Sequence, residues 1–251
     1  MIYAKSGSEV MQRRSLVTSP GSGRQHWGAQ FFGPRYVTTE TSSAPQALMT
    51  DMSPDETILA HFHGVSQFQV FAGGAGKMGR HDLNGIVVQF KDHHTAYGPV
   101  VAGVQGLRFF AMRMHTANSG PVYLDKPGYR EKLQPSKRRN LLSPPVVLSN
   151  DLVLETRRAV ANEPVYAEAF DDGLDARLLR LGAGMSAPAP DPSLAGGLYL
   201  FVVNGSLAWA DAKLPAWSMV AVETVEAPFS IKAGERGLEV LVLQFPREQA
   251  L

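Results

Sequence analysis

The fold is decided by a stretch that reads HFHGVSQFQVFAGG and runs from residue 61 to residue 74. Two histidines, one residue apart, enter an apolar run that ends on glycines. Alternate side chains of a β-strand point the same way, so we expect His61 and His63 on one face, within reach of a single ion. Buried imidazoles are costly without partners. The two histidines therefore predict a site.

The same alternation places three further side chains of this stretch. If the extended conformation continues past a bend at residues 64–66, Gln67, Gln69 and Phe71 share one face. Buried amides, like imidazoles, cost free energy unless they are hydrogen-bonded. The stretch therefore predicts a polar row on an otherwise apolar strand.

Length and composition exclude several classes of protein. The chain has 251 residues, of which 44% are hydrophobic and 19% are charged, as in a globular protein of one large or two ordinary domains. A formal net charge of +1 gives no general electrostatic case for nucleic acid or an anionic membrane as a partner. No cysteine is present, which excludes disulfides, thiolate metal sites and cysteine nucleophiles.

Two further patterns point to a cytoplasmic protein. No segment approaches the roughly 18 consecutive apolar residues of a membrane span. Residues 1–23 are polar and rich in serine and glycine, without the apolar core of a secretory signal.

Phosphate-loop, dinucleotide and nucleophile-elbow motifs are also missing from the sequence.

Short β-type runs separated by glycine and proline turns dominate the chain. They indicate an all-β barrel or sandwich. The expected strands lie at 36–39, 47–49, 57–60, 67–72, 86–90, 97–103, 107–112, 177–181, 198–203, 218–222 and 238–243.

The second half of the chain repeats the first at one constant offset. Adding 131 to a residue number takes Gly74 to Gly205 and the pair Gly106-Leu107 to Gly237-Leu238, and Ala102-Gly103 becomes Ala233-Gly234. A single ungapped offset that matches turn glycines and the strand after them predicts two copies of one β module.

The two copies differ in their polar groups. Under the same offset, His61 becomes Pro192, His63 becomes Leu194, Gln67 becomes Leu198 and His94 becomes Val225. No histidine follows His115. Any imidazole chemistry therefore belongs to the first copy.

The motif spacing resembles the first motif of the cupin superfamily, in which His-x-His is followed by a carboxylate or amide and then by a glycine. Here the positions are His61, His63, Gln67 and Gly74. A second cupin motif usually offers one more histidine about thirty residues further on, where this chain has the adjacent pair at 93–94. Together with the repeat, the resemblance covers roughly residues 35–250. It identifies the chain as similar to bacterial two-domain cupins, or bicupins.

The resemblance implies two tandem double-stranded β-helix barrels, which are jelly-roll-like. The expected division is an N-terminal arm at 1–34, a first barrel with the histidines at 35–115, a connection at 116–163 and a second barrel at 164–251. Cupins commonly pair through their sheets, so a homodimer is expected.

The resemblance also implies a divalent metal, which in this family is iron, manganese, nickel, copper or zinc. Carried over by position, its ligands are His61, His63 and His94, with Gln67 at the usual glutamate place. We prefer His94 to His93 because it shares strand parity with residues 88 and 90. Replacing the glutamate by an amide removes one negative charge, which weakens metal binding or marks a pocket whose metal has been lost.

The remaining candidates are assigned by their place on the expected strands. The ligand pocket is expected to include Gln69, Phe71, Phe90, His93 and Tyr97. Arg108 and Arg113 are expected to form rim salt bridges, with an anion clamp as the alternative. Three isolated histidines are expected on the surface or in packing: His26, His81 and His115.

Two functional hypotheses follow. The first is a metal-dependent enzyme of dioxygenase or lyase/isomerase type that acts on a small organic molecule. The second is a non-catalytic bicupin that binds a small ligand, as a sensor or carrier, in a remodelled or metal-free pocket with Gln67 and Gln69 as hydrogen-bonding groups.

Overall fold

The structure is a computed structural model of the whole chain. It describes residues 1–251 except 19–22, 24, 36–43, 135–138 and 248–251, so the strand expected at 36–39 lies outside the described residues. The chain divides into two compact units. Residues 13–147 form the N-terminal unit, and residues 1–12 together with 148–251 form the C-terminal unit. Both units are built from antiparallel strands, as predicted.

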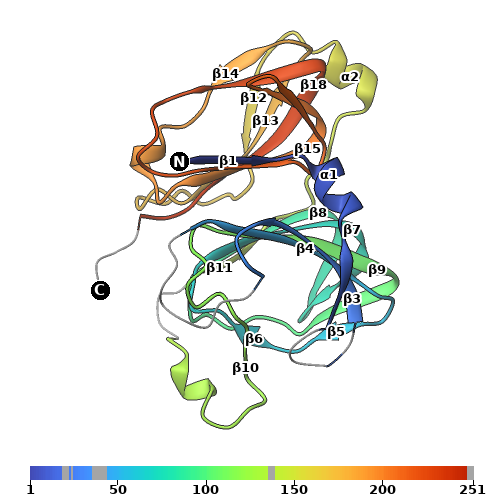
Figure 1. Cartoon of the computed structure of the whole chain (residues 1–251), viewed down its shortest axis with the longest axis vertical. Coiled ribbons are helices and arrows are strands. Elements are labelled where there is room, and N and C mark those ends of the chain that lie inside the picture. Colours follow the sequence, from blue (N-terminus) through green and yellow to red (C-terminus); the bar gives the residue numbers. More distant parts are fainter. Residues whose placement is uncertain (19–22, 24, 36–43, 135–138, 248–251) are drawn as a thin grey trace. The chain divides into compact units, whose positions relative to one another are not determined.

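Within its described residues, the N-terminal unit contains an eight-stranded sheet and a two-stranded one (Figure 1). The large sheet has the order β11-β8-β7-β9-β4-β3-β2 with β5 on β9, and β10 pairs with β6. The elements are β2 (Ser15–Thr18), β3 (Gln25–Phe32), β4 (Gln46–Met52), β5 (Thr57–Ile58), β6 (His61–Phe62), β7 (Gln67–Met78), β8 (His81–Lys91), β9 (Val100–Arg113), β10 (Val122–Tyr123), a 3-10 turn (Arg130–Lys132) and β11 (Asn140–Leu142).

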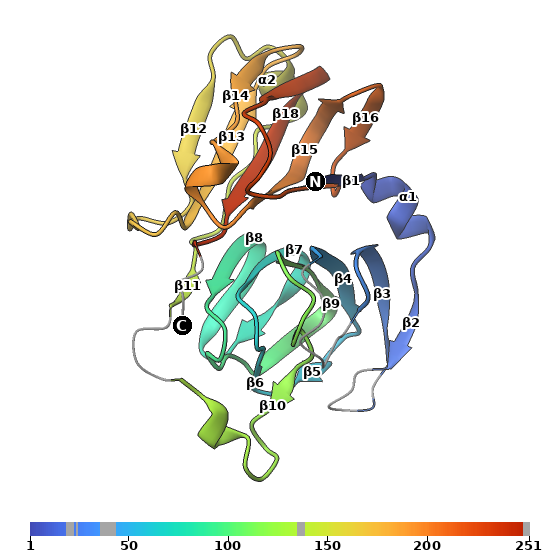
Figure 2. The same cartoon turned by 60° about the vertical axis from the view of Figure 1, so that its left-hand side comes forward.

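The C-terminal unit is built on a sheet of the order β1-β17-β15-β18-β13-β12, with β14 on β18 and β16 on β15 (Figure 2). Its first strand comes from the start of the chain, because β1 pairs with β17. The elements are β1 (Ile2–Lys5), α1 (Gly7–Gln12), α2 (Asp151–Glu155), β12 (Ala161–Pro164), β13 (Asp175–Leu181), β14 (Ser186–Pro188), a 3-10 turn (Pro192–Leu194), β15 (Leu198–Trp209), β16 (Ala212–Pro215), β17 (Met219–Val222) and β18 (Ser230–Gln244).

Alternation along the long central strands builds an apolar core in each unit. On β15, Leu198, Leu200 and Val202 point into a core of buried aliphatic side chains. On β7, Phe71 joins a core cluster of the N-terminal unit and contacts the ring of Phe109. Burying these side chains stabilises each unit by roughly 1.5–3 kcal/mol per residue.

The predicted repeat is visible in the backbone. Gly74 has a φ of +70° and Gly205 a φ of +68°. A Cβ on Gly74 would collide with the carbonyl oxygen of Gly106, and a Cβ on Gly205 would collide with that of Gly237. The same strained crossing therefore occurs at the same place in both units, at irregularities in the β7–β9 and β15–β18 pairings.

These glycines are expected to be intolerant of any side chain. Gly74→Ala should lower the free energy of unfolding by more than about 2 kcal/mol, because it adds a backbone collision to the cost of the left-handed conformation. Gly85 is the matched control: its φ is +72°, but nothing lies within 4 Å of an added Cβ. Gly85→Ala should cost about 1 kcal/mol. Urea denaturation of both variants checks this, and equal losses would contradict it.

Candidate functional site

The N-terminal unit contains a cavity of about 40 Å³. That volume accommodates a few water molecules or a small organic group. Its apolar wall includes Leu48, Ile58, Val100 and Phe109. Its polar lining consists of His26, Thr50, His61, His63, Gln69, Tyr97, Arg113 and Tyr123.

His61 and His63 approach the cavity from β6 and the residue after it. Both are buried, with 5% and 3% of their surface exposed, and their ring centroids are 5.0 Å apart. Nδ1 of His61 lies 2.7 Å from the carbonyl oxygen of Leu59, and Nδ1 of His63 lies 2.7 Å from that of Ser119. A carbonyl oxygen can only accept, so each Nδ1 carries the proton. Each Nε2 is consequently a hydrogen-bond acceptor.

Both imidazoles are held in the neutral form. Burial, reinforced by the nearby positive charge of Lys91, lowers the pKa of His61 to about 3. Burial, followed by the charge of Arg113, lowers the pKa of His63 well below its ordinary value of 6.5. At neutral pH the site therefore presents two uncharged imidazoles.

The lowered pKa of His61 predicts a loss of stability in acid. In the unfolded chain this group takes up a proton near pH 6.5, whereas in the folded chain it does so only near pH 3. Its contribution is present above pH 6.5 and is lost as the pH falls towards 3. Between pH 7 and pH 5 the loss should be about 2 kcal/mol. Urea denaturation at both pH values should show this loss shrinking in His61→Gln and persisting in the control His81→Gln, whose histidine is exposed.

The hydroxyl of Tyr97 lies at the meeting point of three side chains. It is 3.0 Å from Nε2 of Gln67, 3.2 Å from Nε2 of Gln69 and 3.3 Å from Nε2 of His63. Since Nε2 of His63 accepts, the hydroxyl donates its proton there and accepts an N–H from each glutamine. Tyr97 is also bridged through its backbone to His61. These groups, together with Arg113, are called the polar cluster below.

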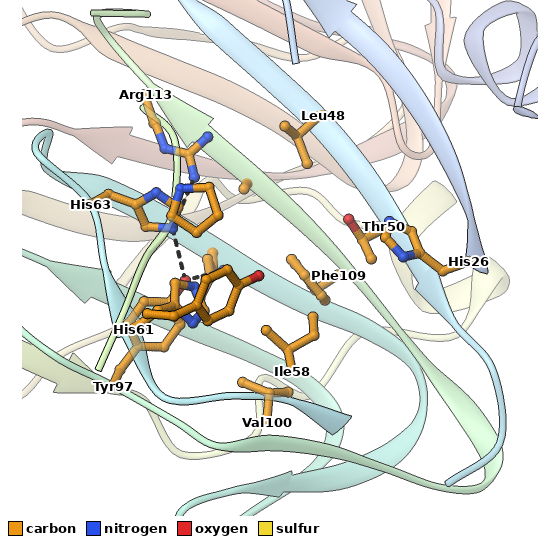
Figure 3. Close-up of a pocket in the computed structure, with 14 residues that line it drawn as sticks. His26, Leu48, Thr50, Ile58, His61, His63, Tyr97, Val100, Phe109 and Arg113 are labelled. Atoms are coloured by element: carbon orange, nitrogen blue, oxygen red, sulfur yellow. Dashed lines mark hydrogen bonds between the residues drawn. The ribbon is translucent and has the colours of Figure 1, made fainter. Parts of the chain in front are cut away.

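Arg113, at the end of β9, fixes the orientation of Gln67. Its Nη2 and Nε lie 2.6 Å and 3.0 Å from Oε1 of Gln67, and its Nη1 donates to Oε1 of Gln46. The same Nη2 lies 3.4 Å from Nε2 of His63 (Figure 3). Because the guanidinium has only donors, Gln67 must turn its oxygen towards Arg113 and its amide nitrogen towards Tyr97.

A buried lysine lies behind the tyrosine ring. Lys91 is paired in register with Gln67 and is 2% exposed. Its Nζ lies 2.8 Å from the ring centroid of Tyr97 and has no hydrogen-bond partner among the described residues. Burial, followed by the charge of Arg113, lowers the pKa of Lys91 well below 10.5.

A second polar group lies across the apolar wall of the cavity. In Figure 3, Phe109 and Ile58 lie between the His61–Tyr97 pair and the pair formed by Thr50 and His26. Nη2 of Arg35 lies 3.2 Å from Nε2 of His26 and 3.1 Å from Oγ1 of Thr50. The two polar groups therefore lie on opposite sides of the apolar part of the cavity wall.

The structure brings some of the predicted site residues together and leaves others apart. His61, His63, Gln67, Gln69 and Tyr97 form one network. Gln67 belongs to this network without lining the cavity, and the other predicted residues that do not line it are Phe71, Phe90, His93 and His94.

Strand register explains why Phe90 and His94 are elsewhere. Phe90 is paired with Phe68 and packs against its ring. The side chains of β8 that face the polar cluster belong to the neighbouring positions, 89 and 91. Choosing His94 because it shares strand parity with Phe90 therefore selects the face of β8 that points away from the polar cluster. His94 follows in a turn with a φ of +56°, and its Nδ1 lies 2.7 Å from Nδ1 of His93. From this segment, Tyr97 is the side chain that reaches His61 and His63.

Sequence reasoning did not place four residues that shape the site. Arg113 was expected at the rim, and His26 on the surface or in packing, yet they are 2% and 3% exposed. Arg108 does form the half-exposed salt bridge that was expected, with Asp51 at 2.6 Å. Thr50 and Lys91 were not considered. Strand parity could have revealed Lys91. It stands two residues after Gln89, so both side chains point to the same face of β8, and these two positions pair with Gln67 and Gln69.

The donors present do not match the metal centre that the resemblance implies. The third histidine and the carboxylate of that centre are replaced by a tyrosine hydroxyl and by Gln67, whose oxygen is bonded to a guanidinium. Among the described residues, no group of three or more histidine, cysteine, aspartate or glutamate side chains is placed to hold a metal ion. A positive charge at hydrogen-bond distance from both Gln67 and His63 opposes a cation there. The polar cluster thus does not fit a three-histidine, one-carboxylate metal site.

The C-terminal unit has no counterpart to the polar cluster. The positions equivalent to Gln67, Gln69, Gln89 and Lys91 are occupied by Leu198, Leu200, Val220 and Val222. All four of these residues are buried in the apolar core of that unit. At these four positions the C-terminal unit is apolar, and its buried polar groups lie elsewhere, as in the ion pair of Arg180 with Glu239.

Comparisons with known proteins identify the fold. Comparison with protein-family models and with the sequences of curated proteins gave no match. Among solved structures, a protein of Nostoc punctiforme proposed to be a dioxygenase has a TM-score of 0.64 at 11% identity, over 100% of this chain and 85% of that one. Pirin of Escherichia coli, solved with nickel(II), has a TM-score of 0.53 at 12% identity over 99% and 100%.

A third similar structure is itself a two-domain cupin. Oxalate decarboxylase of Bacillus subtilis has a TM-score of 0.55 at 11% identity, over 98% of this chain and 78% of that one. Together these likenesses show that the chain has the cupin fold in two tandem copies. No helix in the described residues is long and apolar enough to cross a membrane.

Proposed function

We propose that this bicupin binds a small organic molecule in the cavity of its N-terminal unit without the help of a metal ion. The observation that carries the proposal is the Tyr97 hydroxyl, which receives N–H groups from Gln67 and Gln69 and donates to His63. This hydroxyl occupies, through its hydrogen bonds, atoms that a metal ion would need, Nε2 of His63 among them. The pocket is remodelled for hydrogen bonding.

The composition of the cavity wall supports binding of a small molecule. Pockets for small ligands combine apolar walls with a few oriented polar groups. Here Leu48, Ile58 and Phe109 supply the apolar surface, and the polar cluster supplies groups whose orientation is set by other side chains. Orientation in advance lowers the entropy cost of binding. We assign the protein a role as a carrier or sensor on this basis.

A metal-dependent reaction of dioxygenase or lyase/isomerase type is the second candidate, because one observation favours it. Nδ1 of both His61 and His63 is bonded to a backbone carbonyl, which leaves Nε2 directed away from the chain. Histidines that bind metals commonly show this arrangement. Under this candidate, iron, zinc, nickel, manganese or copper would be held by His61 and His63. The hydrogen-bonded arrangement of Gln67, Tyr97 and Arg113 described above argues against this candidate.

Thermal unfolding in the presence of a chelator separates the two candidates. A library of small neutral and acidic compounds should raise the unfolding temperature of the wild type with the chelator present. His61→Ala should abolish that rise, and His81→Ala, which changes an exposed histidine of the same unit, should leave it intact. A rise that requires a divalent metal would favour the second candidate.

The expected homodimer is tested separately by light scattering.

A further inference from the structure

Two acceptor atoms of the polar cluster have no donor among the described residues. Gln69 is 3% exposed and gives its amide nitrogen to the hydroxyl of Tyr97, so its Oε1 points elsewhere and has no hydrogen-bond partner. The network fixes this orientation. His63 can only accept the hydroxyl proton, so the amide of Gln69 must donate to the tyrosine oxygen.

The second open acceptor is Nε2 of His61. Its ring is 5% exposed and lines the cavity. Its Nδ1 donates to the carbonyl oxygen of Leu59, so the proton is on that nitrogen and Nε2 presents a lone pair. The described residues give this nitrogen no donor. Oε1 of Gln69 is a fully buried acceptor without a donor, which is rare in native proteins, whereas Nε2 of His61 is an open acceptor on a ring that lines the cavity; both mark places where a water or a ligand completes the structure.

We infer that the ligand of this cavity is a small neutral molecule that donates hydrogen bonds through a hydroxyl or an amide N–H, and that carboxylates are rejected. This inference rests on the proposed binding function and names its ligand class. A carboxylate offers only lone pairs, which would face those of Gln69 and His61, and the N–H groups of Arg113 that would bind it already donate to Gln67, Gln46 and His63. A cationic amine would instead meet the guanidinium of Arg113, which lies 3.4 Å from Nε2 of His63.

The size of the cavity limits the rest of the ligand. A volume of about 40 Å³ admits only a few heavy atoms beyond the donor group. The side chains of Leu48, Ile58, Val100 and Phe109 are apolar, so those atoms are a short hydrocarbon segment. Since a cavity of about 150 Å³ holds benzene, this volume fits an alcohol or a primary amide of three or four heavy atoms.

A matched series of two-carbon probes tests the ligand class. Ethanol, acetamide, dimethyl ether, acetate and ethylamine are of similar size and differ in the polar group. Ligand-observed NMR on the full-length protein measures their dissociation constants. The alcohol and the amide should bind at least about 10-fold more tightly than the ether, the carboxylate or the amine, because they are the uncharged donors of the series: the alcohol gives one O–H to one open acceptor, and the amide has two N–H groups for both.

Variants show which atoms are responsible. Gln69→Met removes one of the two open acceptors at similar size and leaves Nε2 of His61, so it should reduce the preference for the alcohol over the ether by at least about 3-fold. Gln89→Met is the control, since Gln89 is buried opposite Gln69 on β8 and does not line the cavity. It should leave the preference unchanged.

Three outcomes would overturn the inference. Equal or tighter binding of acetate, the ether or ethylamine by the wild type refutes the ligand class and leaves the binding function standing. An undiminished alcohol preference in Gln69→Met refutes the assignment of the Gln69 oxygen as an acceptor. Failure of all five probes to bind refutes the proposed binding function, and the inference with it.

Discussion

Changing Gln67 to glutamate and Tyr97 to histidine together is expected to create a divalent-metal site in the N-terminal unit. The double variant would present three imidazoles and a carboxylate, the set that the cupin resemblance implies. The side chain at position 97 already lies beside His61 and His63, with ring centroids 4.4 Å and 6.2 Å apart. Affinity for nickel(II) or manganese(II) should rise on the order of 100-fold, since even outer-shell partners change metal affinity 10- to 100-fold.

Calorimetric titration of wild type and variants with the two metals measures this gain. Tyr97→Phe is the control for loss of the hydroxyl alone and should not bind metal. A variant that combines Gln67→Glu with His94→Ala tests position 94. Adding His94→Ala to Gln67→Glu should have no effect on metal affinity. If the wild type bound metal as tightly as the double variant, the account of a remodelled centre would be contradicted.

Arg113→Met is expected to cause a large loss of stability for a single substitution in the polar cluster. The change removes the donors to Oε1 of Gln67 and of Gln46, which are both fully buried. Each buried acceptor left without a donor costs about 1–3 kcal/mol, so the free energy of unfolding should fall by roughly 3 kcal/mol or more. Ligand binding should be lost as well, because Gln67 no longer holds its amide towards Tyr97.

Arg108 on the same strand is the matched control. Its salt bridge with Asp51 is partly exposed, with 28% and 25% of the two side chains accessible. Arg108→Met should therefore cost less than about 1 kcal/mol. Urea denaturation of both variants compares the losses. A loss for Arg113→Met no greater than that for Arg108→Met would show that the buried guanidinium does not organise the site.

The parts of the site that lie within one strand could be predicted from sequence. Gln67 and Gln69 share a face because strand alternation is strictly local, and both reach the hydroxyl of Tyr97. The repeat could be predicted for a similar reason. Gly74 and Gly205 occupy a backbone position that tolerates only glycine, so the sequence records it in both copies.

The parts that depend on register and on turns could not be predicted. His94 lies after the end of β8, where a left-handed residue breaks the alternation on which the parity argument depended. Arg113 reaches Gln67 across the β7–β9 pairing, whose strands are separated in the sequence by β8, so no hairpin turn fixes their register and residue spacing alone does not reveal the contact. His26 comes to the cavity from β3, which no motif links to the histidines at 61 and 63.

The metal content of the wild-type protein tests the central claim most directly. Protein purified without chelator, and then reloaded in turn with iron(II), manganese(II), nickel(II), copper(II) and zinc(II), is desalted and measured by mass spectrometry. The hydrogen-bonded arrangement of Tyr97, Gln67 and Arg113 predicts far less than one ion per chain, with no difference between wild type and His61→Ala. One ion per chain that is lost in His61→Ala and in His63→Ala, and kept in His81→Ala, would contradict it.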